Sequence, residues 1–293
     1  MQINKITIGT DVEFFVVDED MNSVSVEGLL GGTKKEPLAI GNNCFRQEDN
    51  VNAEFSMGPV LFGETDKFVA QIEYCRQKGN ELLAEHNLHL LAGSSREIPE
   101  HYLQTEQTRT FGCHPSYSVY TQEVQDIPGP DEVGNLRTCG FHIHVGFKDV
   151  EKAWFFDTME HLIRLFDLYV GVPSVLIDLD TRRREIYGNP GDFRFRFLEE
   201  NNVSIFEYRS IGGTLLANKE SIAFVFDSVC NAIKNYFENG ADIVNVISQE
   251  EEIQRIIKQG DQEAARNMLA AFNIPAPTFS IFEENIVNHL EKV

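Results

Sequence analysis

Four short segments of the chain each carry two polar or charged residues separated by a single residue. The pairs are Asp11 and Glu13, His142 and His144, Arg194 and Arg196, and Glu207 and Arg209. On a β-strand, residues two apart point to the same side of the sheet, and the residues flanking these pairs are mostly apolar. We therefore expect four strands that bury one face and present acids, imidazoles and guanidiniums on the other. Glu54, in the segment NAEFSM, is expected to join this polar face.

Each pair also has an ordinary structural explanation when it is taken alone. An acidic pair on a strand is usually solvated, and R-x-R or E-x-R pairs can form surface ion pairs that contribute little stability. The H-x-H pair is more suggestive, because neutral imidazole is a common metal ligand. The four pairs together are harder to explain as surface residues, since charges of both signs on one half-apolar sheet need each other or a ligand.

The ligand that this set of side chains fits is a metal-bound triphosphate. Carboxylate oxygens suit Mg²⁺ or Mn²⁺, whose octahedral shells are completed by phosphate and water. Arginines bind phosphate oxygens through paired hydrogen bonds and stabilise charge that develops during phosphoryl transfer. The sequence contains no G-x-x-x-x-G-K-[ST] motif and no G-x-G-x-x-G after a strand. We therefore expect ATP to be held by side chains and metal ions on the sheet.

Six sequence pieces follow one another between Gly9 and Gly213: GTDVEFF, DNVNAEF, FGCHPSY, RTCGFHIHVG, RRREIYGNPGDFRFR and FEYRSIGG. In this order they resemble the glutamine synthetase and glutamate–cysteine ligase superfamily of carboxylate–amine ligases, and in particular the short COOH-NH2 ligases of bacteriophages. The specific part of the resemblance is R-x-x-Y-G-x-x-G-x-F-R with E-Y-R soon after it.

The resemblance implies a role for each candidate site residue. The implied metal ligands are Asp11, Glu13, Glu54, His142 and Glu207. The implied nucleotide-binding residues are His144, which lies nearer the nucleotide in such enzymes, and Arg196. The implied catalytic residues, which hold the phosphates and an acyl-phosphate, are Arg184, Arg194 and Arg209. The triplet Arg182-Arg183-Arg184 leaves open which arginine faces the site, although Arg184 fits the spacing to Tyr187-Gly188 best.

The function expected from these residues is an ATP- and Mg²⁺- or Mn²⁺-dependent ligase that forms an amide bond between a carboxylate and an amine through an acyl-phosphate. Three alternatives stay open: a phosphotransferase of the same fold, a metal-dependent hydrolase that uses the H-x-H pair, and a nucleotide-binding protein that has lost catalysis. The acid and amine, which could be small molecules or peptides, are not identified by the sequence. Cys113 and Cys139 lie beside the motifs and are read as packing residues rather than nucleophiles.

The elements that would position these residues alternate without a regular strand–helix–strand repeat, which favours the α+β class. We expect a glutamine-synthetase-like catalytic domain, with a curved, mainly antiparallel sheet and helices packed on one face. It would span residues 1–240, with a helical C-terminal extension, residues 241–293, packed on it. The expected helices are 64–86, Asp149 to about Tyr169, 217–238, 247–258, 261–271 and 279–291. The polar connection 95–135, and above all Tyr102–Pro130, is expected to cover the site as a lid.

Charge and composition limit the partners and the location. The formal net charge of −21 argues against intact nucleic acid as a partner. The sequence has no apolar run long enough to cross a membrane and no signal peptide, so we expect a cytoplasmic protein, in a host cell if a phage encodes it. Five widely spaced cysteines without C-x-x-C predict neither zinc nor disulfides. Because the first acidic strand begins near residue 1, a glutamine-synthetase-type ring is not expected, although another oligomer is left open.

Overall fold

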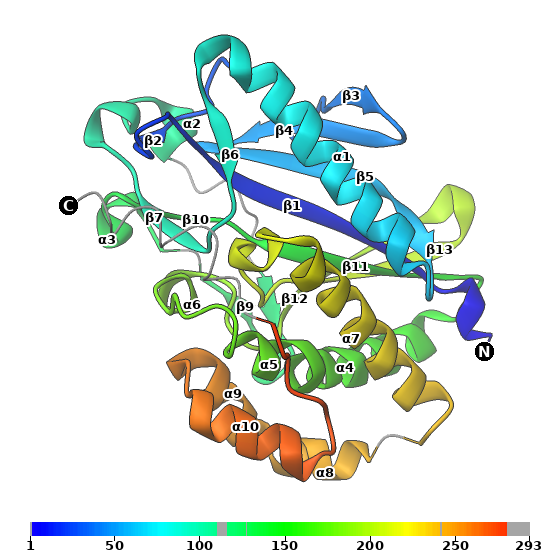
Figure 1. Cartoon of the computed structure of the whole chain (residues 1–293). Helices are drawn as coiled ribbons and strands as arrows, with labels where there is room; N and C mark the ends of the chain where they lie inside the picture. The colour runs from blue at the N-terminus through cyan, green and yellow to red at the C-terminus, as the bar shows by residue number, and fades with distance from the viewer. Residues whose placement is uncertain (1, 110–115, 127, 241, 280–293) are drawn as a thin grey trace.

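The computed structural model describes residues 2–109, 116–126, 128–240 and 242–279, and within them eleven strands form one sheet. The strands are β1 (Thr7–Val17), β2 (Ser23–Val24), β3 (Leu38–Gly41), β4 (Cys44–Asp49), β5 (Asn52–Leu61), β6 (His89–Leu91), β8 (Ser116–Ser118), β9 (Val124–Gln125), β11 (Phe141–Lys148), β12 (Asp192–Leu198) and β13 (Val203–Tyr208). Their order is β3-β4-β5-β1-β11-β13-β12-β8-β9, and β2 and β6 pair with the end of β1 (Figure 1). A separate pair joins β7 (Ser95–Glu97) to β10 (Leu136–Thr138).

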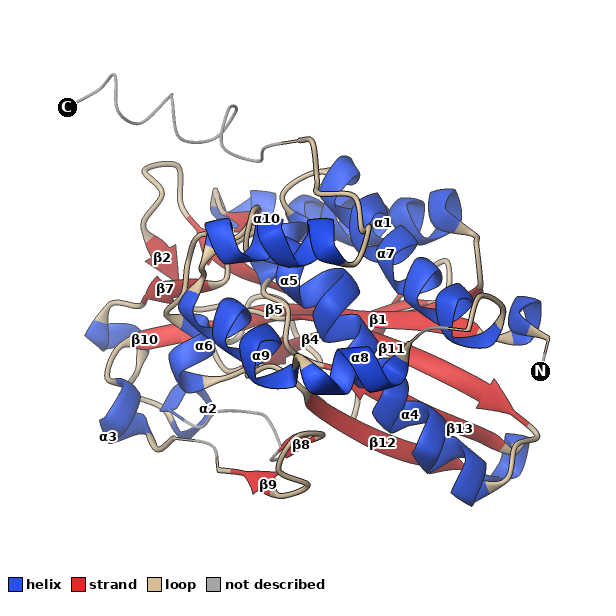
Figure 2. Ribbon diagram, turned by 90° about the horizontal axis from the view of Figure 1, so that it is seen from below, coloured by secondary structure: helices blue, strands red, loops and turns tan. Residues whose placement is uncertain are grey.

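Helices cover one side of this sheet in two layers. The first layer consists of α1 (Thr65–Leu83), α4 (Lys152–Phe166) and α7 (Lys219–Phe237), and α7 contacts both of the others. The second layer consists of α8 (Ile243–Ser248), α9 (Glu250–Gln259) and α10 (Gln262–Ala271), which lie beneath α4 and α5 (Val172–Ser174) in Figure 1. The short helices are α2 (Glu106–Arg109), α3 (Pro130–Val133) and α6 (Arg183–Ile186). Figure 2 shows the same two layers from below.

The apolar half of the strand alternation forms the core against the first helix layer. Phe141, Ile143, Val145 and Phe147 of β11 are all fully buried. Phe68 of α1 stacks on Phe141 at 6.3 Å between ring centroids and tilts against Phe226 of α7 at 4.7 Å. Because the apolar residues face the helices, the residues between them, including His142 and His144, must face the opposite side of the sheet.

The expected α+β class, with a mainly antiparallel sheet and helices on one face, is confirmed, and every strand pair of the described residues is antiparallel. The helices expected at 64–86, 217–238 and 261–271 are confirmed as α1, α7 and α10, and the one expected at 247–258 is divided into α8 and α9. The expected cap at Asp149 is wrong. This residue has φ +57° and its carboxylate accepts a hydrogen bond from Asn202, so it belongs to a turn before α4, which begins at Lys152.

Two expected segments fall partly or wholly outside the described residues. The helix expected at 279–291 lies there almost entirely, and so do 110–115 of the expected lid, including Cys113. The other four cysteines are buried free thiols. Residues 243–271 form the second helix layer, whose apolar side chains join the same core as the sheet.

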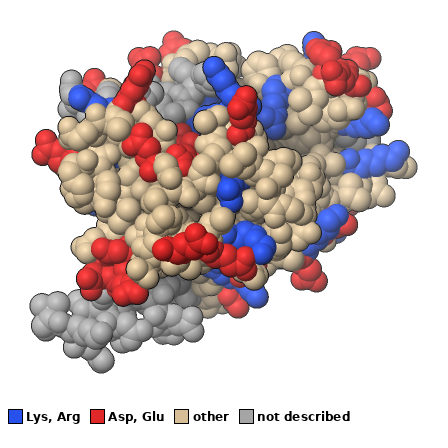
Figure 3. Space-filling model, turned by 90° about the horizontal axis from the view of Figure 1, so that it is seen from above, with Lys and Arg blue, Asp and Glu red and all other residues tan. Residues whose placement is uncertain are grey.

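None of the helices in the described part of the chain combines the length and the apolarity that a membrane crossing requires. On the face shown in Figure 3, acidic and basic side chains are interspersed, and the cations do not gather into one continuous patch.

Candidate active site

The central strands of the sheet bring the predicted acids and imidazoles together on the face away from the helices. In the β1–β11 ladder, Asp11 lies opposite His142, and in the β1–β5 ladder Glu13 lies opposite Glu54. In the β11–β13 ladder, His144 lies opposite Glu207. The polar pairs of distant segments therefore become neighbours because their strands are adjacent and in this register.

The first group of potential metal ligands, which we call the Asp11 cluster, consists of Asp11, His144 and Glu207. One ligand atom from each of the three lies within 4.8 Å of the others. His144 Nε2 is 3.2 Å from Asp11 Oδ2, and the second imidazole of the strand, His142, places Nδ1 3.5 Å from Glu207 Oε1. His144, which the resemblance placed nearer the nucleotide, thus lies among the acids.

The second group, the Glu13 cluster, consists of Glu13, Glu54 and Asp49. Their carboxylates are all buried and also lie within 4.8 Å of one another. The backbone N–H of Gly140 donates to Glu13 Oε2 at 2.7 Å, and Gln47 donates to Glu54 Oε2 at 2.6 Å. Lys34 Nζ lies 3.0 Å from Asp49 Oδ2. Three buried carboxylates this close repel one another strongly, so the cluster attracts cations.

Burial and the neighbouring charges shift the pKa values of the acids in both clusters. Burial, and then the charge of Asp49, raises the pKa of Glu13 from 4.5 to about 7. Burial and the same neighbour raise the pKa of Glu54 well above its usual value. Burial also raises the pKa of Glu207. For Asp11, burial acts to raise the pKa, but the attraction and hydrogen bond of His144 outweigh it and lower the pKa.

The two imidazoles have opposite electrostatic environments although they share one strand. Burial, and then the positive charges of Arg209 and Arg183, hold the pKa of His142 well below its usual value, so His142 is neutral. Burial would lower the pKa of His144 as well, but the charge and hydrogen bond of Asp11, together with the charge of Glu207, outweigh burial and raise the pKa. Because a metal ion binds the neutral form of imidazole, His142 is already in that form, whereas a metal ion at His144 would compete with the proton that Asp11 favours.

Two buried guanidiniums adjoin the acids, and both lie over one aromatic ring. The guanidinium carbons of Arg183 and Arg209 lie 5.3 and 5.2 Å from the ring centroid of Tyr187. Arg209 forms an ion pair with Glu207, and Arg183 donates to the backbone carbonyls of Arg209 and Ser210 at 2.9 and 3.0 Å. Both side chains are almost fully buried. Stacking on the ring stabilises two like charges at short range.

Arg194 and Arg196 lie on the same face, beside the Asp11 cluster. Arg194 stands opposite Glu207 in the β12–β13 ladder. With His144, Phe195, Arg196, Ile205 and Glu207, it lines a cavity of about 220 Å³. The positive charge of Arg196 helps to lower the pKa of Asp11. Both arginines are therefore close enough to the acids to contact a phosphate group bound between them.

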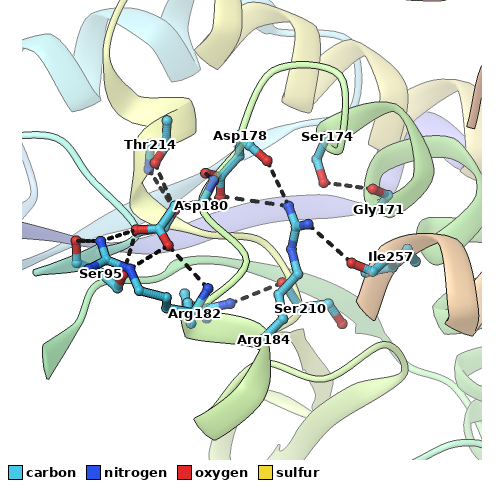
Figure 4. A network of polar contacts seen from close by, with 12 residues as sticks. Ser95, Gly171, Ser174, Asp178, Asp180, Arg182, Arg184, Ser210, Thr214 and Ile257 are labelled. Carbon is cyan, nitrogen blue, oxygen red and sulfur yellow. Dashed lines mark hydrogen bonds and ion pairs between the residues drawn. The ribbon is translucent and has the colours of Figure 1, made fainter. Parts of the chain in front are cut away.

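The structure does not bring Arg184 to this face. Its guanidinium donates to the backbone carbonyls of Ile257 and Asp178, each at 3.1 Å, and it is buried between α6 and α9 (Figure 4). Arg182 is half-exposed and pairs with Asp180 at 2.9 Å. Of the three successive arginines, Arg183 is the one beside Arg209, and its charge reaches Glu13.

Three residues of the site were not assigned from the sequence: Asp49, Arg183 and Tyr187. Asp49 lies in the quoted segment DNVNAEF, where a two-residue turn at Asn50-Val51 pairs it with Asn52. A hairpin reading of that segment would have placed Asp49 near Glu54. For Arg183, the helical conformation of the triplet decides the direction of each side chain, and the spacing in the sequence alone does not reveal it.

The donor chemistry of both clusters fits divalent metal ions. The Glu13 cluster offers oxygen only, which suits Mg²⁺ or Mn²⁺, and the Asp11 cluster adds an imidazole to two carboxylates. The two clusters adjoin on one face, because Asp11 and Glu13 are two residues apart on β1. The arrangement can thus hold cations between a floor of acids and a rim of guanidiniums.

Comparison with known protein families gives a match to the model described as phage phiEco32-like COOH.NH2 ligase-type 2, over residues 115–284. Because the match covers more than half of the chain, the protein belongs to this family of carboxylate–amine ligases. The matched residues include the histidines of β11, the arginines of β12 and the Glu207–Arg209 pair, whereas Asp11, Glu13 and Glu54 precede them. The expected relationship to the phage ligases is confirmed.

Among solved structures, the chain resembles one from the crystal structure of the complex between prokaryotic ubiquitin-like protein Pup and its ligase PafA. The TM-score is 0.41 at 11% identity, and the match covers 95% of this chain. This chain aligns with 60% of that longer chain. A likeness of this strength does not by itself establish a shared fold or a shared substrate. No curated protein sequence gives a significant match.

Proposed function

We propose that the protein is an ATP- and divalent-metal-dependent ligase that joins a carboxylate to an amine through an acyl-phosphate. The observation that supports this most is the adjacency of two acidic clusters and buried arginines on one sheet face. Family membership supplies the reaction class, and the site supplies groups for each charge that the reaction must handle. We propose a small-molecule or peptide acid and amine as substrates.

The first step transfers the γ-phosphoryl group of ATP to the acid. A carboxylate oxygen of the substrate bonds to the γ-phosphorus, the bond to the β,γ-bridging oxygen breaks, and ADP leaves. Metal ions at the two clusters would neutralise the triphosphate, with Asp11, His144 and Glu207 holding one and Glu13, Asp49 and Glu54 the other. Arg194 and Arg209 would bind the equatorial phosphoryl oxygens, where negative charge accumulates.

The second step forms the amide. The amine nitrogen bonds to the acyl carbon, inorganic phosphate leaves with the bonding electrons, and the nitrogen loses a proton. The site must exclude water at this stage, because water would hydrolyse the acyl-phosphate. Arg183 and Arg209, both held against the Tyr187 ring, would hold the departing phosphate without rearranging.

The deciding experiment incubates the purified protein with ATP, Mg²⁺ and pools of acids and amines, and measures phosphate release together with new amide masses. A ligase requires both products, and both should be lost in Glu207→Gln. Glu85→Gln, a change at an exposed position, is the matched control and should keep full activity. Phosphate transferred to an acid or a guanidino group without amide formation would identify a phosphotransferase. Hydrolysis of amides or esters without ATP would identify a metal hydrolase, and binding of ATP without turnover an inactive nucleotide-binding protein.

A further inference from the structure

A buried carboxylate lies directly beneath the strand that carries Glu207 and Arg209, on the helix side of the sheet. Asp167 is the first residue of a π-helical turn, Asp167–Gly171, that continues α4, and it has no exposed surface. Its Oδ1 accepts a hydrogen bond from the hydroxyl of Tyr208 at 2.7 Å, and its Oδ2 accepts one from the hydroxyl of Tyr120 at 2.8 Å. Asp167 therefore ties a helix to two separate segments.

Tyr208 stands between the two site residues on β13. Since side chains alternate along a strand, Tyr208 points to the helices while Glu207 and Arg209 point to the site. Its ring packs edge-on against Phe166 at 5.6 Å. The lack of a side chain at Gly171 gives the Tyr208 hydroxyl its room, because a Cβ there would lie 3.0 Å from that oxygen. The hydroxyl thus has one defined position.

Arg209 and Ser210, which follow β13, are also held by Arg183 on the site face and by the neighbouring strand β12. Arg183 donates to the carbonyls of Arg209 and Ser210, and the backbone N–H of Arg209 donates to the Asp192 carbonyl at 3.0 Å. Asp167, through Tyr208, holds the same stretch of backbone from the helix side of the sheet. The backbone between Glu207 and Ser210 is therefore fixed from both sides, which sets the depth and the rotation of the site side chains.

A carboxylate at this position is unfavourable for simple packing. Burial raises the pKa of Asp167 to about 7, so its charge is kept at a cost in a place where an apolar side chain could pack. The hydroxyls of Tyr208, Tyr120 and Ser210 and the backbone N–H of Gly191 compensate part of that cost through directional hydrogen bonds. π-Helical turns are also found often at functional sites. The carboxylate therefore contributes directional hydrogen bonds rather than favourable packing.

We propose that Asp167 is a positioning residue: through Tyr208 it places the Glu207 carboxylate and the Arg209 guanidinium for metal and phosphate binding. The proposal rests on the function proposed above for the same site. The hydrogen bond from Tyr120 instead anchors the segment that follows β8, away from Glu207 and Arg209, and therefore provides a matched control. Tyr208→Phe and Tyr120→Phe each remove one hydroxyl from the same carboxylate and leave the ring in place.

The experiment compares these two variants with wild type by three measurements. Tyr208→Phe and Tyr120→Phe should lower the melting temperature by similar amounts. Tyr208→Phe should weaken Mn²⁺ binding at least tenfold, as measured by electron paramagnetic resonance. It should also lower kcat at least tenfold, with a smaller change in KM for ATP. Tyr120→Phe should stay within twofold of wild type in Mn²⁺ affinity and in kcat. Hydrogen exchange of peptides over Val203–Ser210 should accelerate only in Tyr208→Phe. Asp167→Asn, which keeps the shape and one acceptor oxygen, should fall between wild type and Tyr208→Phe.

The outcomes separate this inference from the proposed function. If wild type forms no amide or binds no Mn²⁺, the proposed function fails, and hydrogen exchange over Val203–Ser210 still decides whether Tyr208 orders the strand. Equal losses of Mn²⁺ affinity and kcat in Tyr208→Phe and Tyr120→Phe would show that Asp167 has a general role in stability and would overturn the positioning role. So would a Tyr208→Phe variant with wild-type exchange over this strand. If Tyr208→Phe does not fold, Asp167→Asn replaces it, and an Asp167→Asn variant with wild-type Mn²⁺ affinity and exchange would overturn the inference equally.

Discussion

Replacing Glu13 by glutamine should stabilise the metal-free protein above neutral pH while removing a ligand from the Glu13 cluster. Burial and the charge of Asp49 raise the pKa of Glu13 from 4.5 to about 7. Between these two pH values the folded state keeps a proton that the unfolded chain has released, so the unfolding free energy falls as pH rises through the window. At 1.36 kcal/mol for each pKa unit, the ionised carboxylate costs the folded state about 3 kcal/mol above pH 7.

Glutamine does not titrate, and its amide oxygen can still accept the hydrogen bond from the Gly140 N–H. In EDTA, Glu13→Gln should match wild type near the acid end of the window and exceed its unfolding free energy by up to about 3 kcal/mol at pH 8. For a chain of this size each kcal/mol corresponds to roughly 2–4 °C in Tm. Mn²⁺ at 1,000 times its Kd should reverse the order, because it adds about 4.1 kcal/mol to the protein that binds it, which exceeds the cost of the buried charge.

Thermal and urea unfolding at pH 5 and pH 8, with EDTA or with Mn²⁺, measure these differences. Glu85→Gln alters an exposed carboxylate and should follow wild type under all four conditions. Parallel pH profiles of wild type and Glu13→Gln in EDTA would refute the claim that the buried charge of Glu13 destabilises the empty site. An equal gain from Mn²⁺ in both proteins would remove Glu13 from the ligand set.

Three further predictions concern the charges around the acids. ATP should bind weakly without a divalent cation, because the acidic clusters repel the triphosphate until metal neutralises them; calorimetry showing equal affinity with and without Mg²⁺ would point to another site. Arg209→Lys should lower kcat about a hundred- to thousandfold while circular dichroism shows a folded protein, since an ammonium cannot copy paired hydrogen bonds to phosphate; an Arg209→Lys enzyme with wild-type kcat would exclude that role. Arg184→Lys should instead lower Tm and keep most of kcat, because Arg184 bonds the Ile257 and Asp178 carbonyls; a rate loss without a loss of Tm would contradict its placement.

The strands that could be predicted from the sequence are those in which polar and apolar residues alternate. The pairs at 11 and 13, 142 and 144, and 194 and 196 fall on strands with apolar neighbours, and Glu207 lies on β13 with Arg209 one residue beyond its end. The alternation of polar and apolar residues therefore revealed both faces of the sheet. The hairpin β3–β4 was not predicted, because its segment, LAIGNNCFRQED, mixes polar and apolar residues without a regular period. Its outer strand, β3, lies at the edge of the sheet and is mostly exposed, so its sequence shows no apolar alternation.

The features of the site that could not be predicted depend on contacts between residues far apart in the sequence. Whether Arg183 or Arg184 faces the acids depends on α9, which supplies the carbonyl of Ile257 from more than seventy residues away. Asp167 looks like an ordinary polar residue near the end of a helix, and its function depends on two tyrosines from other elements. Neither residue carries a local pattern that distinguishes it from its neighbours.

The two acidic clusters differ in charge, and that difference suggests an order of events. The Glu13 cluster has three buried carboxylates, with Lys34 beside Asp49. The Asp11 cluster has two carboxylates, a histidine whose pKa is raised, and the positive charges of Arg194 and Arg196 close by. A bare divalent ion is therefore attracted more strongly to the Glu13 cluster, while the guanidiniums oppose one at the Asp11 cluster. A triphosphate would remove that opposition by pairing with the guanidiniums, so we expect a second ion to enter together with ATP.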